Sequence, residues 1–247
     1  MSEYLIFAAV FSVGLFSSFI GSQVGSGGLI VVPFLIFLGL PPHFAIGTHR
    51  LATVFGSIVS IRKYLKSGKI IWKYVITFTL LSVIIGILGV QVLFSVNAEI
   101  ASNIVGVGVL LPLPLLFLKE IGIKQRSISS TATLIGYVLY ALLSFWGGMF
   151  GPGSKTMFLY LLTFVFGFTF IQALATRVIP AFFSRIVIFL LFANAGMVNW
   201  TYGFFLVLGY IVGCHIGVDV ALRKGNEWIR LLLTVVVVLS SLKLILF

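Results

Sequence analysis

Two clusters rich in glycine interrupt apolar stretches of this chain, and both contain groups that could hold an anion. The first reads Gly21-Ser-Gln-Val-Gly-Ser-Gly-Gly28, and the second reads Gly147-Gly-Met-Phe-Gly-Pro-Gly-Ser-Lys155. Glycine accepts a positive φ and lets a ligand approach the backbone closely. A helix that begins after such a break points free N–H groups and its positive dipole end into the gap. Each cluster therefore predicts a helix start that could bind an anion.

The two clusters occupy corresponding positions in the two halves of the chain. When Gly21 is set on Gly147, with a two-residue gap after the clusters, further residues pair: Gly25 with Gly151, Gly27 with Gly153, Gly39 with Gly167, Ala45 with Ala173, and Thr48 with Thr176. Paired, glycine-interrupted segments mark the substrate site in transporters that are built from repeats. The alternative is that these glycines only let helices pack closely.

The candidate ligands for an anion are the backbone at the breaks and the polar side chains beside them. Hydroxyl and amide groups donate hydrogen bonds without carrying a charge, and a cation inside an apolar segment is a candidate functional residue. The expected binding residues are Gln23, Gly25, Ser26, Gly27, Gly28, Thr48, Gly151, Gly153, Ser154, Lys155, Thr176 and Arg177. For a single hydroxyl the alternative is a helix cap or an interhelical hydrogen bond.

The basic residues inside apolar segments have alternatives of their own. Arg50 and Arg177 lie near predicted helix ends and could snorkel to an interface, and Arg185 could pair with a carbonyl. Lys155 lies in the first turn of a predicted helix, the unfavourable end for a cation. We expect an anion to pair with its ammonium group, and we expect removal of the charge to leave the empty protein at least as stable. The alternative is a structural pairing with a helix carbonyl.

Three side chains are candidates for proton coupling: His49, His215 and Asp219. Histidine titrates near neutral pH, and His215, Asp219 and Arg223 follow one another at i+4 steps on one helical face. The alternative for Asp219 is an ion pair with Arg223 at the end of a helix.

The sequence contains no motif for catalysis or for metal binding. His-Glu-x-x-His, Gly-x-Ser-x-Gly and Walker patterns are absent from it, and its single cysteine, Cys214, excludes an intrachain disulfide and a cysteine-based metal cluster. We therefore expect no catalytic residue, no metal and no cofactor, and we expect that the protein is not an enzyme.

The composition is that of a membrane protein. Hydrophobic residues make up 60% of the chain and charged residues 9%, against about 25% charged residues in soluble domains. Apolar stretches cover 4–20, 29–39, 44–66, 71–95, 98–118, 128–146, 155–166, 170–192, 199–222 and 227–246. Because a full span needs about 20 residues, 29–39 and 155–166 are predicted as half-length helices. The predicted fold is an all-α polytopic membrane protein.

The positions of the basic residues predict how the segments are oriented across the membrane. The net charge is +11 with 16 Lys and Arg residues, and most of the basic residues fall in three loops, 62–73, 119–127 and 223–230. Cytoplasmic loops retain Lys and Arg, which explains the charge better than nucleic-acid binding does. The scheme gives five segments to each half, so 1–122 and 123–247 are predicted as inverted repeats with both termini external. Whether 4–20 crosses or re-enters is left open.

Both clusters resemble known signatures. Gly25-Ser-Gly-Gly-Leu-Ile-Val-Val-Pro33 with Leu38-Gly-Leu-Pro-Pro-His-Phe-Ala-Ile-Gly-Thr48 resembles the first repeat of the sulfite exporter TauE/SafE family, and Gly147 to Ser154 with Ala173-Leu-Ala-Thr176 is similar to the second. The resemblance spans essentially the whole chain. The chain departs from it at Gly-Pro-Gly-Ser-Lys155, where a further glycine and an apolar residue are expected, and this departure concerns the substrate more than the fold.

The resemblance implies a permease for small sulfur oxyanions such as sulfite, sulfoacetate or related sulfonates. Together with the glycine breaks it predicts a secondary transporter that works by alternating access around an anion site near the membrane midplane. The alternatives are an anion channel, or a membrane-embedded accessory protein or enzyme. The expected location is the cell membrane, and the expected partners are a small anion and the lipid bilayer, with a homo-oligomer as a further possibility.

Overall fold

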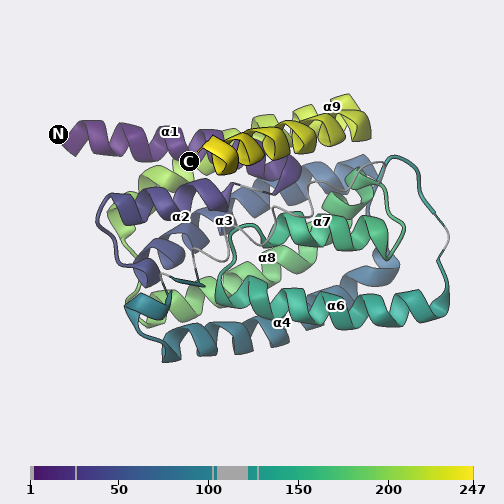
Figure 1. Cartoon of the computed structure of the whole chain (residues 1–247), viewed down its shortest axis with the longest axis horizontal. Coiled ribbons are helices and arrows are strands. Elements are labelled where there is room, and N and C mark those ends of the chain that lie inside the picture. Colours follow the sequence, from purple (N-terminus) through teal and green to yellow (C-terminus); the bar gives the residue numbers. More distant parts are fainter. Residues whose placement is uncertain (1–2, 26, 102, 105–121, 127, 247) are drawn as a thin grey trace.

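The structure is a computed structural model that describes residues 3–25, 27–101, 103–104, 122–126 and 128–246. Within these residues every regular element is a helix (Figure 1). The helices are α1 (Glu3–Val24), α2 (Gly28–Phe37), α3 (Pro42–Ser67), α4 (Trp72–Ser95), α6 (Ser130–Met149), α7 (Ser154–Phe164), α8 (Phe170–Asn194) and α9 (Trp200–Leu246). The predicted segment 98–118 lies almost entirely outside the described residues.

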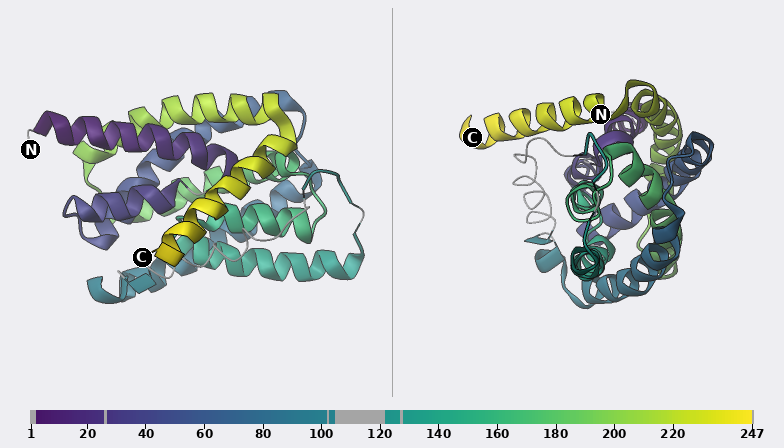
Figure 2. Two further views of the ribbon diagram at one scale, coloured as in Figure 1. Left: turned by 45° about the horizontal axis from the view of Figure 1, so that its top comes forward. Right: turned by 90° about the vertical axis from the view of Figure 1, so that its right-hand side faces the viewer.

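Among the described residues, six helices are long and apolar enough to cross a membrane: α1, α3, α4, α6, α8 and the part of α9 up to Leu233. The chain is therefore an all-α polytopic membrane protein, as the composition predicted. The stretches 199–222 and 227–246, predicted as separate segments, are two helices that meet at the non-helical residue Gly225 and together carry the label α9. Gly225 has a φ of 78° and a ψ of −166°, and Figure 2 shows the last part of α9 leaving the direction of the first.

Local sequence signals set the helix boundaries. Pro42 stands in the first turn of α3, where its missing N–H costs no hydrogen bond, and α3 ends at Gly68, whose φ is 65°. At the start of α8, Thr169 accepts a hydrogen bond from the Gln172 backbone N–H, and the Gln172 side chain accepts one from the Thr169 N–H. The sequence therefore marks both ends of α3 and the start of α8.

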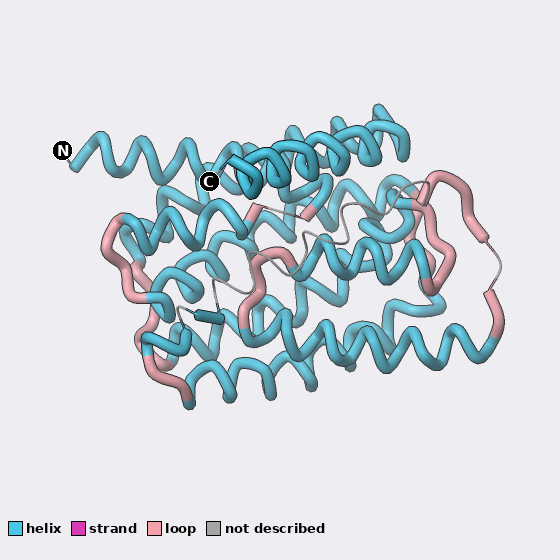
Figure 3. The backbone as a smooth tube through the Cα atoms, viewed as in Figure 1, coloured by secondary structure: helices cyan, strands magenta, loops and turns pink. Residues whose placement is uncertain are grey.

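The helices pack in three layers, and the extensive contacts join the two halves of the chain (Figures 1 and 3). α1 lies against α9 on one side, and α4 lies against α6 on the opposite side. Between these pairs, α3 packs on α8 and α9, and α8 also packs on α4. Neither half buries its apolar faces alone.

The short helices α2 and α7 each form a hairpin with the helix before them. They have 10 and 11 residues, so each rises about 15 Å, half of a bilayer core. In Figure 1 α1 runs into the bundle and α2 returns to the end from which α1 entered, while α6 and α7 do the same from the opposite end. The stretch 4–20 thus belongs to a helical hairpin that begins and ends at the same end of the bundle.

Three basic segments gather at one end of the bundle, which we call the basic end and define by residues 62–73, 122–126 and 223–230. Lys63 of α3 pairs with Asp219 of α9 at 2.5 Å, and the Asn226 side chain donates to the carbonyl of Ile123. The three segments are therefore neighbours in space, as a common side of the membrane requires.

Candidate functional site

The glycine breaks of the two hairpins lie against each other inside the bundle. Gly25 and Gly151 have φ values of 95° and 86°, which residues with a side chain rarely adopt. A methyl group at Gly25 would lie 2.5 Å from the backbone nitrogen of Thr156, and one at Gly28 would lie 3.0 Å from the Cα of Pro152. Glycine is needed here both for the backbone conformation and for the close approach of the two breaks.

A central cavity of about 120 Å³ opens between the breaks, which is several times the space that one water molecule needs. All eight described helices contribute to it, α4 through Ser82. Of the predicted binding residues, Gly25, Gly27, Gly28, Gly151, Gly153, Ser154, Lys155 and Arg177 line this cavity. The structure thus brings together residues from both predicted clusters.

Four basic side chains line the central cavity: Arg50, Lys155, Arg177 and Arg185. Among the described residues that line it, none is an aspartate or a glutamate. Opposite charges usually accompany cations that are removed from water, so the charge of this cavity is unbalanced. That imbalance attracts an anion and repels a cation.

Two of these cations bind the carboxyl ends of the interrupted helices. Arg50 Nη2 donates to the carbonyls of Gly147 and Gly148 at 2.7 and 2.8 Å, where α6 ends. Lys155 Nζ donates to the carbonyls of Gly21 and Ser22, both at 2.7 Å, where α1 ends. The alternative given for Lys155, a structural pairing with helix carbonyls, is therefore present. These two hydrogen bonds argue against the expectation that removal of the charge leaves the empty protein at least as stable.

Arg177 and Arg185 have no carboxylate or helix-end partner among the described residues. The Arg177 guanidinium lies 4.0 Å from the ring centre of Phe158, and its Nε and Nη1 have no hydrogen-bond partner among the described residues. Arg185 donates from Nη1 to the hydroxyl of Ser57, a neutral group. These two guanidinium groups therefore carry the charge that nothing in the described cavity wall offsets.

His49 is the proton-coupling candidate that reaches the cavity. Its Nε2 lies 2.9 Å from the hydroxyl of Tyr210, and its buried Nδ1 has no hydrogen-bond partner among the described residues. Tyr210 also lines the cavity. His49 could therefore exchange a proton with a bound anion or with water in the cavity.

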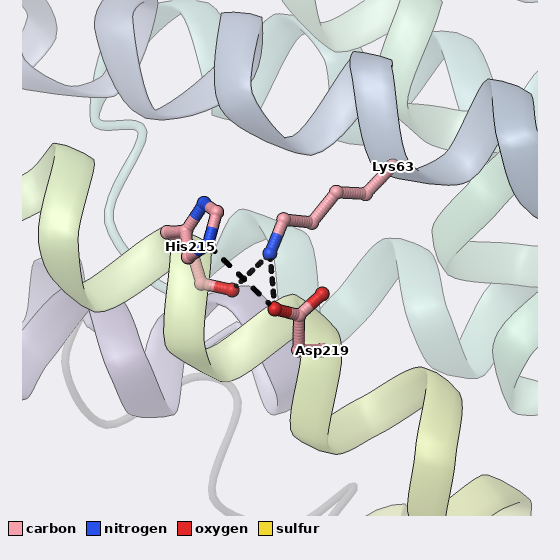
Figure 4. A network of polar contacts seen from close by, with 3 residues as sticks. All are labelled: Lys63, His215 and Asp219. Carbon is pink, nitrogen blue, oxygen red and sulfur yellow. Dashed lines mark hydrogen bonds and ion pairs between the residues drawn. The ribbon is translucent and has the colours of Figure 1, made fainter.

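His215 and Asp219 lie at the basic end rather than at the cavity (Figure 4). Asp219 pairs with Lys63 at 2.5 Å and lies 3.8 Å from His215 Nε2. Lys63 also donates to the His215 carbonyl at 2.6 Å. Figure 4 shows a compact contact between α3 and α9, in which Lys63, and not the expected Arg223, is the partner of the carboxylate.

Three predicted binding residues do not line the cavity. Thr48 accepts a hydrogen bond from the backbone N–H of Asn199, and Thr176 accepts one from the N–H of Ile71. Gln23 accepts a 2.6 Å hydrogen bond from Trp228 Nε1. All three join helices of different halves, while Ser26 lies outside the described residues.

Several lining residues were not among the expected ligands. They are the cations Arg50 and Arg185, the side chains of Tyr210 and Cys214, and hydroxyl residues at Ser17, Ser18, Ser22, Thr53, Ser60, Tyr64, Ser82, Ser144 and Ser184. The available signal was a polar residue inside an apolar segment. That signal identifies Arg50 and Arg185. Single serines are common in packed membrane helices, so the sequence does not distinguish the hydroxyl residues that line the cavity from serines that only pack between helices.

Comparison with known proteins agrees with this geometry. The family profile described as "Sulfite exporter TauE/SafE" matches residues 10–244. A "Probable membrane transporter protein" of Haemophilus influenzae is 29% identical over 97% of this chain and 94% of its own length. "Probable membrane transporter protein YfcA" of Escherichia coli K12 is 28% identical over 99% of this chain and 91% of its own. No solved structure matches. Because the profile covers nearly the whole sequence, the chain belongs to the sulfite exporter TauE/SafE family.

Proposed function

We propose that this protein is a secondary transporter for small sulfur-containing oxyanions, such as sulfite or organosulfonates, and that the central cavity binds them. The observation that carries the proposal is the cavity wall, where Arg50, Lys155, Arg177 and Arg185 meet without a carboxylate among the described lining residues. Bidentate donors such as guanidinium groups match the oxygens of an oxyanion. The names of the family and of its relatives support transport.

Within this proposal the two halves are inverted repeats, 1–122 and 123–247. Equal spacings support the repeat: α8 begins 128 residues after α3 (Pro42 and Phe170), and α9 begins 128 residues after α4 (Trp72 and Trp200). The glycines with positive φ recur as Gly25 with Gly151, Gly39 with Gly167, and Gly68 with Gly196. Such repeats let one half rock against the other around a fixed site, which is alternating access.

We further propose that the basic end faces the cytoplasm of a cell membrane and that both termini are external. All described Lys and Arg residues outside the cavity lie in the three basic segments, if the side chains beyond Leu233 are set aside. Retention of such loops on the cytoplasmic side is the strongest orienting rule for membrane helices.

The experiment that tests the proposed function is a thermal-shift screen of the purified protein against sulfite, sulfoacetate, chloride, acetate and choline. A ligand that binds the folded state raises the melting temperature, and we expect the two sulfur oxyanions to do so. Flux in proteoliposomes then separates a carrier from a channel, because a carrier saturates and is stimulated by substrate on the opposite side. Stabilisation by choline alone would contradict the proposal.

A further inference from the structure

The charge of the central cavity has a consequence for what the protein can do when no substrate is present. Three of its four cations, Arg50, Arg177 and Arg185, are guanidinium groups, which do not give up their proton in proteins. A site built from lysine or histidine could become neutral by releasing protons. This cavity keeps most of its positive charge whether it is filled or empty.

Only part of this charge is offset by the protein. Arg50 and Lys155 bind the carbonyl ends of α6 and α1, and each helix end carries roughly half of a negative charge. Arg185 donates to the uncharged Ser57 hydroxyl, and Arg177 stacks on the Phe158 ring. Asp219, the acid in the ion pairs that the described residues form, lies at the basic end.

Alternating access must pass through a state in which the cavity is closed to both sides. Water and counterions then no longer surround Arg177 and Arg185, and unpaired charges in such surroundings are strongly disfavoured. A bound anion removes this obstacle. The conformational switch through the closed state therefore has a higher barrier when the cavity is empty than when it holds an anion.

Resting on the transport function proposed above, we propose that this protein is an obligatory anion exchanger. The cavity switches from opening on one side of the membrane to opening on the other only when a bound anion neutralises it, and this holds for both directions of the switch. Because at least two guanidinium charges remain without an offset, the site takes either one dianion or two monoanions together. Net one-way movement of a single anion is the mode that this charge distribution suppresses.

The test compares two kinds of proteoliposome that contain the wild-type protein. One is loaded with unlabelled sulfoacetate and the other with gluconate alone, and uptake of radiolabelled sulfoacetate is followed in both. We expect uptake into sulfoacetate-loaded vesicles to exceed that into gluconate-loaded vesicles by at least about tenfold, equivalent to 1.4 kcal/mol between the loaded and empty crossings. Titration calorimetry should give one sulfoacetate, a dianion, or two methanesulfonates, a monoanion, per chain.

Substitutions in the cavity give a sharper test than the wild type alone. Arg185→Gln and Arg177→Gln each remove one charge that lacks an offset. The protein with an empty cavity should therefore switch more readily between opening on the two sides of the membrane. The ratio of exchange to one-way uptake should therefore fall in both variants, even where total uptake is reduced. Arg185→Lys keeps the charge and should keep the ratio. Lys69→Gln removes an exposed charge just after α3 and should behave as the wild type.

Three results would overturn the inference. Equal uptake into both kinds of vesicle would show that the empty cavity returns freely. An unchanged ratio in Arg177→Gln and in Arg185→Gln would separate exchange from these charges. Absence of uptake in both kinds of vesicle, together with absence of calorimetric binding of sulfoacetate and methanesulfonate, would contradict the proposed function itself and the inference that rests on it.

Discussion

Lys155 and Arg50 each complete a helix that belongs to the other half of the chain. The carbonyls that accept from Lys155 are those of Gly21 and Ser22, and those that accept from Arg50 are those of Gly147 and Gly148. These two pairs are the residues that the sequence alignment of the clusters superimposes. The last carbonyls of an interrupted helix lack partners within that helix. A lysine supplies the missing donors for α1, and an arginine supplies them for α6.

Replacement of Lys155 by methionine should change both the stability and the binding of the protein. Loss of two charged hydrogen bonds at the end of α1 should lower the free energy of unfolding by about 1.5–3 kcal/mol. Loss of the positive charge should weaken sulfite binding by at least about tenfold, or 1.4 kcal/mol. Melting curves and equilibrium titrations of the purified variant measure the two effects.

Thr156→Val is the matched control for this prediction. The Thr156 hydroxyl donates to the carbonyl of Val24 at 2.8 Å, in the same turn as Lys155, but it carries no charge. We expect a lower melting temperature with unchanged sulfite affinity. If Lys155→Met behaved in the same way, the ammonium would be a helix cap alone.

At the scale of elements, the two glycine breaks combine a positive φ with close packing beside the cavity. A side chain at Gly25 would collide with the start of α7, and one at Gly151 would lie 2.5 Å from the guanidinium carbon of Arg50. The positive φ at both positions adds strain of about 1–2 kcal/mol for any residue with a Cβ. A side chain at Gly25 therefore requires the two hairpins to move apart, and one at Gly151 requires Arg50 to move.

Gly25→Val and Gly151→Val should abolish transport while the protein still inserts into the membrane, because the six long helices are unchanged. Gly39→Ala provides the control for strain alone. Gly39 has a φ of 92°, yet a methyl group there would meet nothing within 4 Å, so this variant should lose some stability and keep transport. Uptake into proteoliposomes, normalised to inserted protein, checks the three variants. Wild-type uptake by both valine variants would show that the glycines at the breaks serve only the packing of the helices.

The helix starts of α4 and α9 carry a second pair of exchanged contacts. Thr176 accepts from the N–H of Ile71 just before α4, and Thr48 accepts from the N–H of Asn199 just before α9. Both threonine side chains are fully buried. Each contact therefore fixes where a helix of one half begins against a helix of the other.

Thr48→Val and Thr176→Val should each leave a backbone N–H without its partner, which costs about 1–3 kcal/mol of stability. Because neither threonine lines the cavity, sulfite affinity should stay as in the wild type. Thermal melting with and without sulfite measures both quantities. A large loss of affinity without a change in melting temperature would instead return these hydroxyls to the binding site.

The sequence predicted the elements well and the partners poorly, for physical reasons. Short apolar stretches after glycine clusters are read directly from composition, and they became α2 and α7. The partners of Lys155, Thr48 and Thr176 lie more than 100 residues away in the chain. Spacing along one helix carries no information about such contacts, so a residue type alone could not separate a helix cap from a ligand.

At the scale of the whole molecule, the three basic segments lie at one end and the four cavity cations lie inside. Loop charge predicted the first arrangement, because the positive-inside rule depends only on position along the chain. The second arrangement depends on how the eight described helices surround the cavity. The break between 199–222 and 227–246 was also predicted, because a glycine among polar residues interrupts the apolar pattern there, and the structure has its non-helical residue at Gly225.

Reporter fusions should place the two halves in opposite orientations. A reporter joined after Gly122, in the linker between the halves, should lie in the cytoplasm, and one joined to the C-terminus should lie outside. Paired alkaline phosphatase and fluorescent protein fusions read the two sides. Identical readings from the two fusion points would contradict the inverted repeat.

The central claim is that the cavity cations bind a sulfur oxyanion, and equilibrium binding of radiolabelled sulfite to the purified protein tests it most directly. We predict saturable binding to the wild type that sulfoacetate displaces. Lys69→Gln should bind sulfite as the wild type does, while Arg177→Gln should bind it at least about tenfold more weakly, a loss of 1.4 kcal/mol or more. Absence of saturable binding to the wild type, or equal affinity in the wild type and Arg177→Gln, would contradict the claim.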